Sequence, residues 1–199
     1  MLKSSWLSPF KCRIMDIVNR PYYVELWIEK DALISLFDKV ASKKQVHLFP
    51  SRGYTSHTKI YEAQQRFAQQ KANGKQCVLL YFGDLDPSGI DIFRNIANKF
   101  SSSDVKVERK ALDADHVHDL IPIPVKDSDK RSDKFKEFMK ANNLEGCYEL
   151  DAMDAGELTD LASSSIDFYY NKELYPAAEI EEWKQQFDAA RAEILKKLN

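Results

Sequence analysis

The sequence contains no long hydrophobic run. No segment approaches the roughly 20 consecutive apolar residues that a membrane-spanning helix needs, and residues 1–16 lack the continuous apolar core of a secretory signal peptide. These absences predict a soluble, cytoplasmic protein that has no membrane partner.

Cysteines are few and the net charge is small. The three cysteines, Cys12, Cys77 and Cys147, are far apart and form no C-x-x-C pair, which argues against a disulfide framework and a zinc knuckle. We expect all three to be small buried hydrophobes. The formal net charge of -2 provides no general attraction to nucleic acid, because non-specific DNA affinity comes from cations that neutralise phosphates. Any DNA contact must therefore come from local basic patches or from bound metal.

The first part of the chain reads as an α/β core. The chain has 199 residues, 44% of them hydrophobic, which is enough for one sizeable globular core. Within residues 21–125, apolar runs of strand length alternate with segments whose apolar residues recur at helical spacing. The expected strands cover residues 22–28, 46–50, 76–82 and 105–112, and the expected helices cover residues 30–44, 59–72 and 87–100. This alternation predicts right-handed βαβ units and an α/β fold with a mostly parallel central sheet flanked by helices.

The character of the sequence changes after this core. Residues 1–20 are expected to be an N-terminal extension, and residues 126–199 a helical C-terminal extension packed on the core. The latter is expected to contain a charged loop and helix over 126–143, a short strand over 147–153, and helices over 155–171 and 177–198. The last helix carries an apolar stripe, which packs on the protein's own core or serves as a homodimer or partner surface. The stripe consists of Ile180, Trp183, Phe187, Ala190, Ile194 and Leu198.

Three acidic residues fall at the ends of two predicted strands. Glu29 follows the first strand, and Asp84 and Asp86 follow the third within the segment YFGDLDPSGIDIF. In an open parallel sheet the ligand site lies beyond the carboxyl ends of the strands, and residues two apart in an extended segment point to the same side. Carboxylates grouped in this way suit Mg2+, which binds a few of them and keeps water or phosphate oxygens in its other positions.

Asp86 also has a purely structural interpretation. Asp86 followed by Pro87 at a strand-to-helix turn is typical of a helix N-cap and a first helical residue, with Gly89 allowing close packing. This interpretation accounts for Asp86 but not for Asp84 or Glu29. The pattern alone therefore leaves both a metal site and a simple helix cap open.

Basic residues near these strand ends are candidate phosphate contacts. Lys30 lies in the first turn of a predicted helix, where the helix dipole opposes a cation, so it either meets phosphate or a neighbouring carboxylate, or is a solvated surface lysine. Arg52 lies in the segment SRGYTS, which is either a phosphate-facing loop or an ordinary turn. Arg52, Lys59 and Arg131 are the candidate contacts to phosphate or DNA. Arg131 belongs to the Lys/Arg cluster over residues 126–140, whose alternative role is a solvated helix face.

Four segments resemble, in the same order, motifs of the Toprim domain in the topoisomerase VI A subunit and in its relative, the meiotic double-strand-break transesterase. They are WIEKDALISLF, FPSRGYTSHTKIYEAQQRF, LLYFGDLDPSGIDI and CYELDAMDAGELTDLASSSI. The resemblance implies a Rossmann-like Toprim fold in which Glu29, Asp84 and Asp86 bind Mg2+, with Mn2+ as a substitute. It also implies that these three residues, together with Lys30, take part in catalysis.

The resemblance extends further downstream, but it does not include the domain that carries the attacking tyrosine in these relatives. Glu149 and Asp151 match the family's downstream acidic segment and are candidates for supporting the site. The topoisomerase VI relatives carry their attacking tyrosine in a winged-helix domain ahead of the Toprim domain, whereas here about twenty residues precede the first predicted strand. No tyrosine of this chain sits in a matching motif. Either a separate chain supplies the tyrosine, or water attacks, or the chemistry has been lost.

The sequence therefore predicts a Toprim-domain protein that acts on DNA by Mg2+-dependent phosphodiester cleavage or strand transfer. It would be a nuclease or a component similar to topoisomerase VI A, with a tyrosine-bearing chain or an ATPase subunit as candidate partners. One alternative is a non-catalytic accessory module that binds metal, DNA or a partner. Another is a phosphatase of the haloacid dehalogenase type, because D-x-D after an apolar strand also suits an aspartyl nucleophile. Ser88 stands where that family expects threonine or valine.

Overall fold

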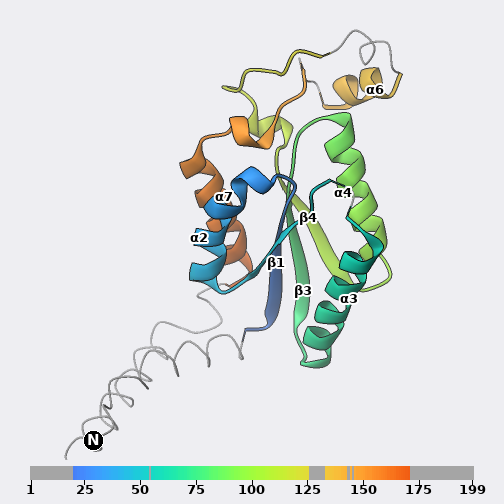
Figure 1. The fold of residues 1–199 in the computed structure, drawn as a ribbon, viewed down its shortest axis with the longest axis vertical. Helices are drawn as coiled ribbons and strands as arrows, with labels where there is room; N and C mark the ends of the chain where they lie inside the picture. The colour runs from blue at the N-terminus through green and yellow to red at the C-terminus, as the bar shows by residue number, and fades with distance from the viewer. Residues whose placement is uncertain (1–19, 54, 126–132, 143, 145, 171–199) are drawn as a thin grey trace, which may run out of the picture. The chain divides into compact units, whose positions relative to one another are not determined.

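The computed structural model describes residues 20–53, 55–125, 133–142, 144 and 146–170 (Figure 1). The chain divides into two compact units, residues 1–166 and residues 167–199. Several expectations fall outside the described residues and stay predictions. They concern Cys12, Arg131, the N-terminal extension up to residue 19, and the helix over residues 177–198 with its apolar stripe.

Four parallel strands form the central sheet. They are β1 (Tyr22–Ile28), β2 (His47–Pro50), β3 (Gln76–Phe82) and β4 (Val105–Ala111), in the spatial order β2-β1-β3-β4 (Figure 1). Strands β1 and β3 lie in the middle of the sheet and are covered on both faces, which explains the unbroken apolar sequence of β3. The predicted α/β fold with a parallel, Rossmann-like sheet is confirmed.

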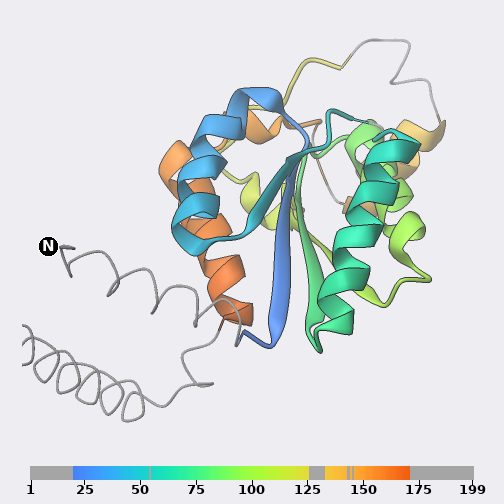
Figure 2. The ribbon, with the colours of Figure 1, turned by 60° about the horizontal axis from the view of Figure 1, so that its bottom comes forward.

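Helices cover both faces of this sheet. Figure 2 shows the two groups: α2 (Ile34–Lys44) and α7 (Ala155–Tyr169) on one face, and α3 (His57–Ala72) and α4 (Pro87–Phe100) on the other. Helix α6 (Asp133–Asn142) packs beside α4, and the short 3-10 turns are η2 (Asp31–Leu33), η3 (Ala114–His116) and η4 (Leu150–Ala152). The helix predicted from residue 30 thus begins as the turn η2. None of the described helices is long and apolar enough to span a bilayer.

The side chains of the central strands alternate between the two helical layers. Trp27 of β1 packs in the core beneath α3 and α4, with its ring centroid 5.8 Å from that of Phe100. On the other face, Phe37 of α2 packs edge-on against Phe82 of β3 at 4.9 Å. Glu29 follows Trp27 by two residues and therefore emerges on the side of α3 and α4.

An ion pair with a fully buried carboxylate and an arginine that is 30% exposed lies within this core. Glu25 of β1 is 0% exposed, and Arg66 of α3 donates to its two carboxylate oxygens from Nε at 2.9 Å and Nη2 at 3.0 Å. The Tyr23 hydroxyl at 2.8 Å and the Trp27 Nε1 at 2.9 Å also donate to it. Burial raises the pKa of Tyr23 and the Glu25 charge adds to this, so the hydroxyl stays a donor. These donors satisfy a carboxylate that has no access to water.

Two side chains cap the first turns of helices. Ser56 Oγ accepts from the backbone N of Lys59 at 3.4 Å at the start of α3. Asp86 Oδ1 accepts from the backbone N of Gly89 at 2.6 Å at the start of α4, whose first residue is Pro87. The structural interpretation of Asp86 is therefore correct.

The strand predicted over residues 147–153 is wrong. Cys147 and Tyr148 pair through isolated antiparallel bridges to Ile123 and Leu85, and the chain then turns into η4. Where the pairing has ended, the backbone N of Leu150 donates to the side chain of Asp84 at 2.7 Å. Cys77 is buried as predicted, whereas Cys147 is only half-buried.

Candidate functional site

Glu29 and Asp84 lie beside each other at the carboxyl edge of the sheet. The parallel register pairs Ile28 with Phe82, the last residues of β1 and β3, and the backbone N of Glu29 donates to the Phe82 carbonyl at 2.9 Å. Glu29 Oε2 then accepts from the backbone N of Asp84 at 3.2 Å. The structure thus brings together the two acidic residues that follow the adjacent strands.

Tyr81 and Gly83 fix the position of the Glu29 carboxylate. The hydroxyl of Tyr81, a fully buried residue, donates to Glu29 Oε2 at 3.0 Å. Burial raises the pKa of Tyr81 and the Glu29 charge raises it further, so the hydroxyl stays protonated. A Cβ at position 83 would lie 2.5 Å from Glu29 Oε2 and 2.6 Å from Tyr81 Cε1, so glycine is required between them.

Asp84 is a carboxyl group that titrates near neutral pH. Its pKa is raised from 3.8 to about 6, chiefly because the group is buried, and the charges of Glu29 and Asp86 add to the rise. The N–H of Leu150, which donates to Asp84 Oδ1 at 2.7 Å, and the nearby Lys30 oppose it. Asp84 therefore gains a proton at a pH where an ordinary aspartate is fully charged.

Lys30 joins Asp84 to the downstream acidic segment. Its Nζ lies 2.8 Å from Asp151 Oδ1, 3.0 Å from Glu149 Oε2 and 3.5 Å from Asp84 Oδ1. Burial lowers the pKa of Lys30, but the hydrogen bonds to Asp151 and Glu149 and the charge of Asp84 outweigh this and raise it overall. Of the interpretations open for Lys30, the structure shows contact with neighbouring carboxylates. We call Glu29, Asp84, Asp86, Glu149 and Asp151 the acidic cluster.

Replacing Lys30 by methionine is expected to raise the pKa of Asp84 above about 6, because the ammonium group is one of the groups that lower it. An NMR titration of the Asp84 carboxyl carbon measures this. Lys59→Met is the matched control, since Lys59 is exposed and pairs with Glu62 in its own helix. An Asp84 pKa that stays the same or falls in Lys30→Met would contradict the role assigned to Lys30.

The acidic cluster fits Mg2+ in donor chemistry but not in arrangement. Carboxylate oxygens are the hard ligands that this cation prefers. Glu29, Asp84 and Asp86 each hold one oxygen against a backbone N–H, which leaves the second oxygen outside these bonds. Among the described residues, however, no three His, Cys, Asp or Glu side chains converge so that they could hold one metal ion. Lys30 supplies the positive charge instead.

The chain was compared with protein-family models, curated proteins and solved structures. None of them matches it. The resemblance to Toprim motifs, and the roles that it implies for the acidic cluster, therefore stay predictions.

The other basic residues predicted as phosphate contacts are engaged elsewhere. Arg52 Nε lies 2.8 Å from Asp31 Oδ2, and the Arg52 side chain is 70% exposed. Lys59 Nζ lies 3.2 Å from Glu62 Oε2, on the exposed side of α3. Arg131 lies outside the described residues. Neither described ion pair includes a member of the acidic cluster.

Sequence reasoning missed Arg109, which lies beneath the acidic cluster. The Arg109 side chain is 8% exposed. Its Nη2 donates to the carbonyls of Asp84 at 2.6 Å, Leu112 at 2.9 Å and Gly83 at 3.1 Å, and its Nε donates to Leu112 at 3.1 Å. A charged residue in the segment VKVERKA gives no sign of burial, so no signal in the sequence identified it.

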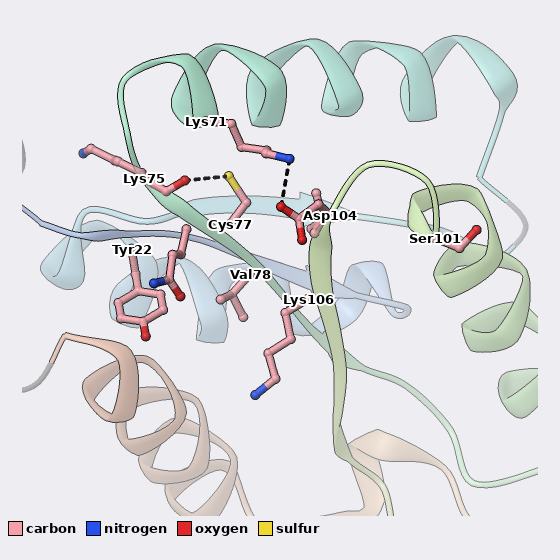
Figure 3. A pocket seen from close by; sticks show the side chains of 10 residues that line it. Tyr22, Lys71, Lys75, Cys77, Val78, Ser101, Asp104 and Lys106 are labelled. Carbon is pink, nitrogen blue, oxygen red and sulfur yellow. Dashed lines mark hydrogen bonds and ion pairs between the residues drawn. The ribbon is translucent and has the colours of Figure 1, made fainter.

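A separate cavity of about 500 Å³ opens at the amino-terminal edge of the sheet (Figure 3). Its basic residues do not converge on a common point. Lys71 bonds to Asp104 at 3.0 Å, whereas the side chains of Lys75 and Lys106 point in different directions (Figure 3). The cavity therefore lacks the grouped charges of an anion site and lies at the opposite end of the strands from the acidic cluster.

Proposed function

We propose that residues 21–125, with residues 149–151, form a Toprim-like domain that acts on the phosphodiesters of DNA. The observation that carries the proposal is the hydrogen bond from the backbone N of Asp84 to the Glu29 carboxylate, which places together two acidic residues that follow adjacent parallel strands. Ligand sites of open parallel sheets lie at this edge. The raised pKa of Asp84, caused chiefly by burial and to a smaller extent by the charges of Glu29 and Asp86, supports it as well, because strongly shifted carboxyl groups cluster at functional sites.

Mg2+, with Mn2+ as a substitute, is the proposed cofactor. Such a cation stabilises charge on the phosphate and on the leaving oxygen when it is bound. Glu29, Asp84 and Asp86 are the proposed ligands. In the present arrangement these side chains do not converge on one position, so they would have to turn to hold the cation together. Lys30 would remain bonded to Asp151 and Glu149.

Tyr81 contacts the acidic cluster but is unsuited to attack phosphorus. The residue has no exposed surface, its hydroxyl donates to Glu29, and its pKa is raised. Water, or a tyrosine from another chain, is therefore the proposed nucleophile. This favours hydrolytic nicking over a complete topoisomerase reaction by this chain alone.

The experiment is a nicking assay on supercoiled plasmid with Mg2+ or Mn2+. We expect the wild-type protein to nick the plasmid and Glu29→Gln to lose at least about 100-fold in rate. Losing a residue that only orients the metal ligands costs about 10–100-fold, and losing a proposed ligand should cost at least the upper end of that range. Asp38→Asn, on the exposed side of α2, is the control and should retain full activity. No nicking with either cation, or equal nicking in Glu29→Gln, would refute the catalytic proposal.

A non-catalytic accessory module is the second candidate. The observation in its favour is Lys30, whose ammonium already balances part of the charge of Asp84, Glu149 and Asp151 without a metal. Calorimetry that detects binding of Mn2+ or duplex DNA by a protein that does not nick would support this candidate. Turnover that depends on Glu29 would exclude it.

A further inference from the structure

We propose that Arg109 is a positioning residue that sets the direction in which the main chain presents Asp84 to Glu29. The importance of Arg109 for a reaction rests on the proposed function. Its hydrogen bonds to the main chain do not depend on that function. The strand register places Arg109 opposite Tyr81, one residue before the end of β3. Its side chain then reaches the loop that follows β3 and carries Asp84.

The peptide group between Gly83 and Asp84 is held from both sides. Its carbonyl oxygen, on Gly83, accepts from Arg109 Nη2 at 3.1 Å and from the backbone N of Leu112 at 2.6 Å. Its N–H, on Asp84, donates to Glu29 Oε2 at 3.2 Å. Because the peptide group is planar, fixing the carbonyl also fixes the direction of the N–H. Arg109 therefore acts on Glu29 through this one peptide plane.

The next peptide group is held by the same guanidinium. Arg109 Nη2 donates to the Asp84 carbonyl at 2.6 Å, and Nε and Nη2 both donate to the Leu112 carbonyl. The backbone N of Gly83 donates to the Ala111 carbonyl at 2.7 Å. Backbone hydrogen bonds therefore also join the loop after β3 to the end of β4. One side chain thus ties three carbonyls from two segments.

Only arginine has the shape for this task. Its planar fork carries several donors in fixed directions, whereas lysine offers a single rotating ammonium group. Burial lowers the pKa of Arg109, and the charges of Asp113 and Glu29 oppose that shift. The guanidinium carbon lies 6.0 Å from the centroid of the Tyr81 ring, so the two groups that position Glu29 and Asp84 also pack on each other.

The test compares Arg109→Lys with Arg66→Lys, which alters a half-buried arginine that pairs with Glu25 and makes no contact with the acidic cluster in the described residues. Amide hydrogen exchange by NMR is the first measurement. In Arg109→Lys we expect the amides of Asp84 and Leu112 to exchange about tenfold faster or more, relative to the amide of Leu79 in the core, since local opening is what exchange reports. Arg66→Lys should leave the ratio of these exchange rates to that of Leu79 unchanged, even if it lowers Tm by as much as Arg109→Lys does.

Affinity for Mn2+, measured by calorimetry, is the second measurement. We expect Arg109→Lys to weaken binding about 10–100-fold, the usual cost of losing a partner that orients metal ligands, and Arg66→Lys to leave it unchanged. Failure of wild-type protein to bind Mn2+ would count against the proposed function, while the exchange ratio would still decide the role of Arg109. An exchange ratio equal in both variants would overturn the positioning role.

A wild-type measurement covers the case in which Arg109→Lys does not fold. The Nη2 protons of Arg109, which bond to the three carbonyls, should exchange with water at least about tenfold more slowly than the Nη protons of Arg94, whose side chain is 67% exposed. Equal exchange rates for the two guanidinium groups would show that Arg109 does not hold these carbonyls, and the proposal would be wrong.

Discussion

Asp84→Asn is expected to stabilise the protein at about pH 8 by roughly 1–3 kcal/mol while it abolishes metal-dependent nicking. A pKa of about 6 in place of 3.8 means that the charged carboxylate costs the folded state about 3 kcal/mol. Asparagine removes that cost and keeps an oxygen for the N–H of Leu150. Part of the gain is lost because Lys30 gives up one of its partners.

The pH dependence of this gain has a definite sign. The folded state holds the Asp84 proton more tightly than the unfolded state, so this group favours folding below pH 3.8 and loses that contribution as the pH rises through about 6. The advantage of Asp84→Asn should therefore be complete at about pH 8, shrink as the pH falls through about 6, and disappear below 3.8. Urea unfolding of both proteins across this range measures it.

Asp151→Asn is the matched control and should behave in the opposite way. Burial raises the pKa of Asp151, but its hydrogen bond and charge interaction with Lys30 outweigh this and lower the pKa overall. The charged form therefore stabilises the folded state at neutral pH, and its loss should weaken folding there. If Asp84→Asn were no more stable than wild type at about pH 8, the charged Asp84 carboxylate would not destabilise the folded state, and the explanation would be wrong.

Arg66→Met is expected to lower the free energy of unfolding by about 3–5 kcal/mol. The change leaves Glu25 charged and fully buried with two neutral donors, Tyr23 and Trp27. Removing one partner of a buried ion pair is costly in this range, because the remaining charge has neither water nor a counterion. Methionine is chosen since it replaces most of the apolar stem of arginine.

Denaturant unfolding at neutral pH measures this loss. Arg94→Met is the control: Arg94 is 67% exposed and pairs with Asp91 on the surface of α4, where an ion pair contributes about 0–1 kcal/mol. The double variant Glu25→Gln with Arg66→Met should recover part of the stability, since no buried charge then remains. Equal losses in Arg66→Met and Arg94→Met would mean that the buried pair does not stabilise the fold.

Much of the fold could be predicted from the sequence. Alternating strands and helices allow few topologies, and the four strands lie within one residue of their expected positions. Helix α4 begins at the predicted Asp86 cap. The proximity of Glu29 and Asp84 follows from parallel topology alone, because adjacent strands end at the same edge.

Polar contacts between distant segments could not be predicted. Lys30 bonds to Asp151, which lies 121 positions later in the chain, and Arg66 bonds to Glu25 over 41 positions. Sequence patterns report local periodicity, so they did not identify Asp151 as the partner of Lys30 or Glu25 as the partner of Arg66. The same holds for residues 147–153, whose strand-like sequence turns into η4, where Leu150 donates to the side chain of Asp84.

The strand order has a consequence for synthesis on the ribosome. Strand β1 is the first to emerge, yet both of its neighbours, β2 and β3, come later in the chain. Roughly 50 residues separate β1 from β3, which at about 5–20 residues per second is a delay of about 2–10 seconds. During that interval the segment YYVELWI has no β3 edge to pair with. Nascent chains paused before residue 76 should therefore be the form that chaperones bind and that aggregates most readily.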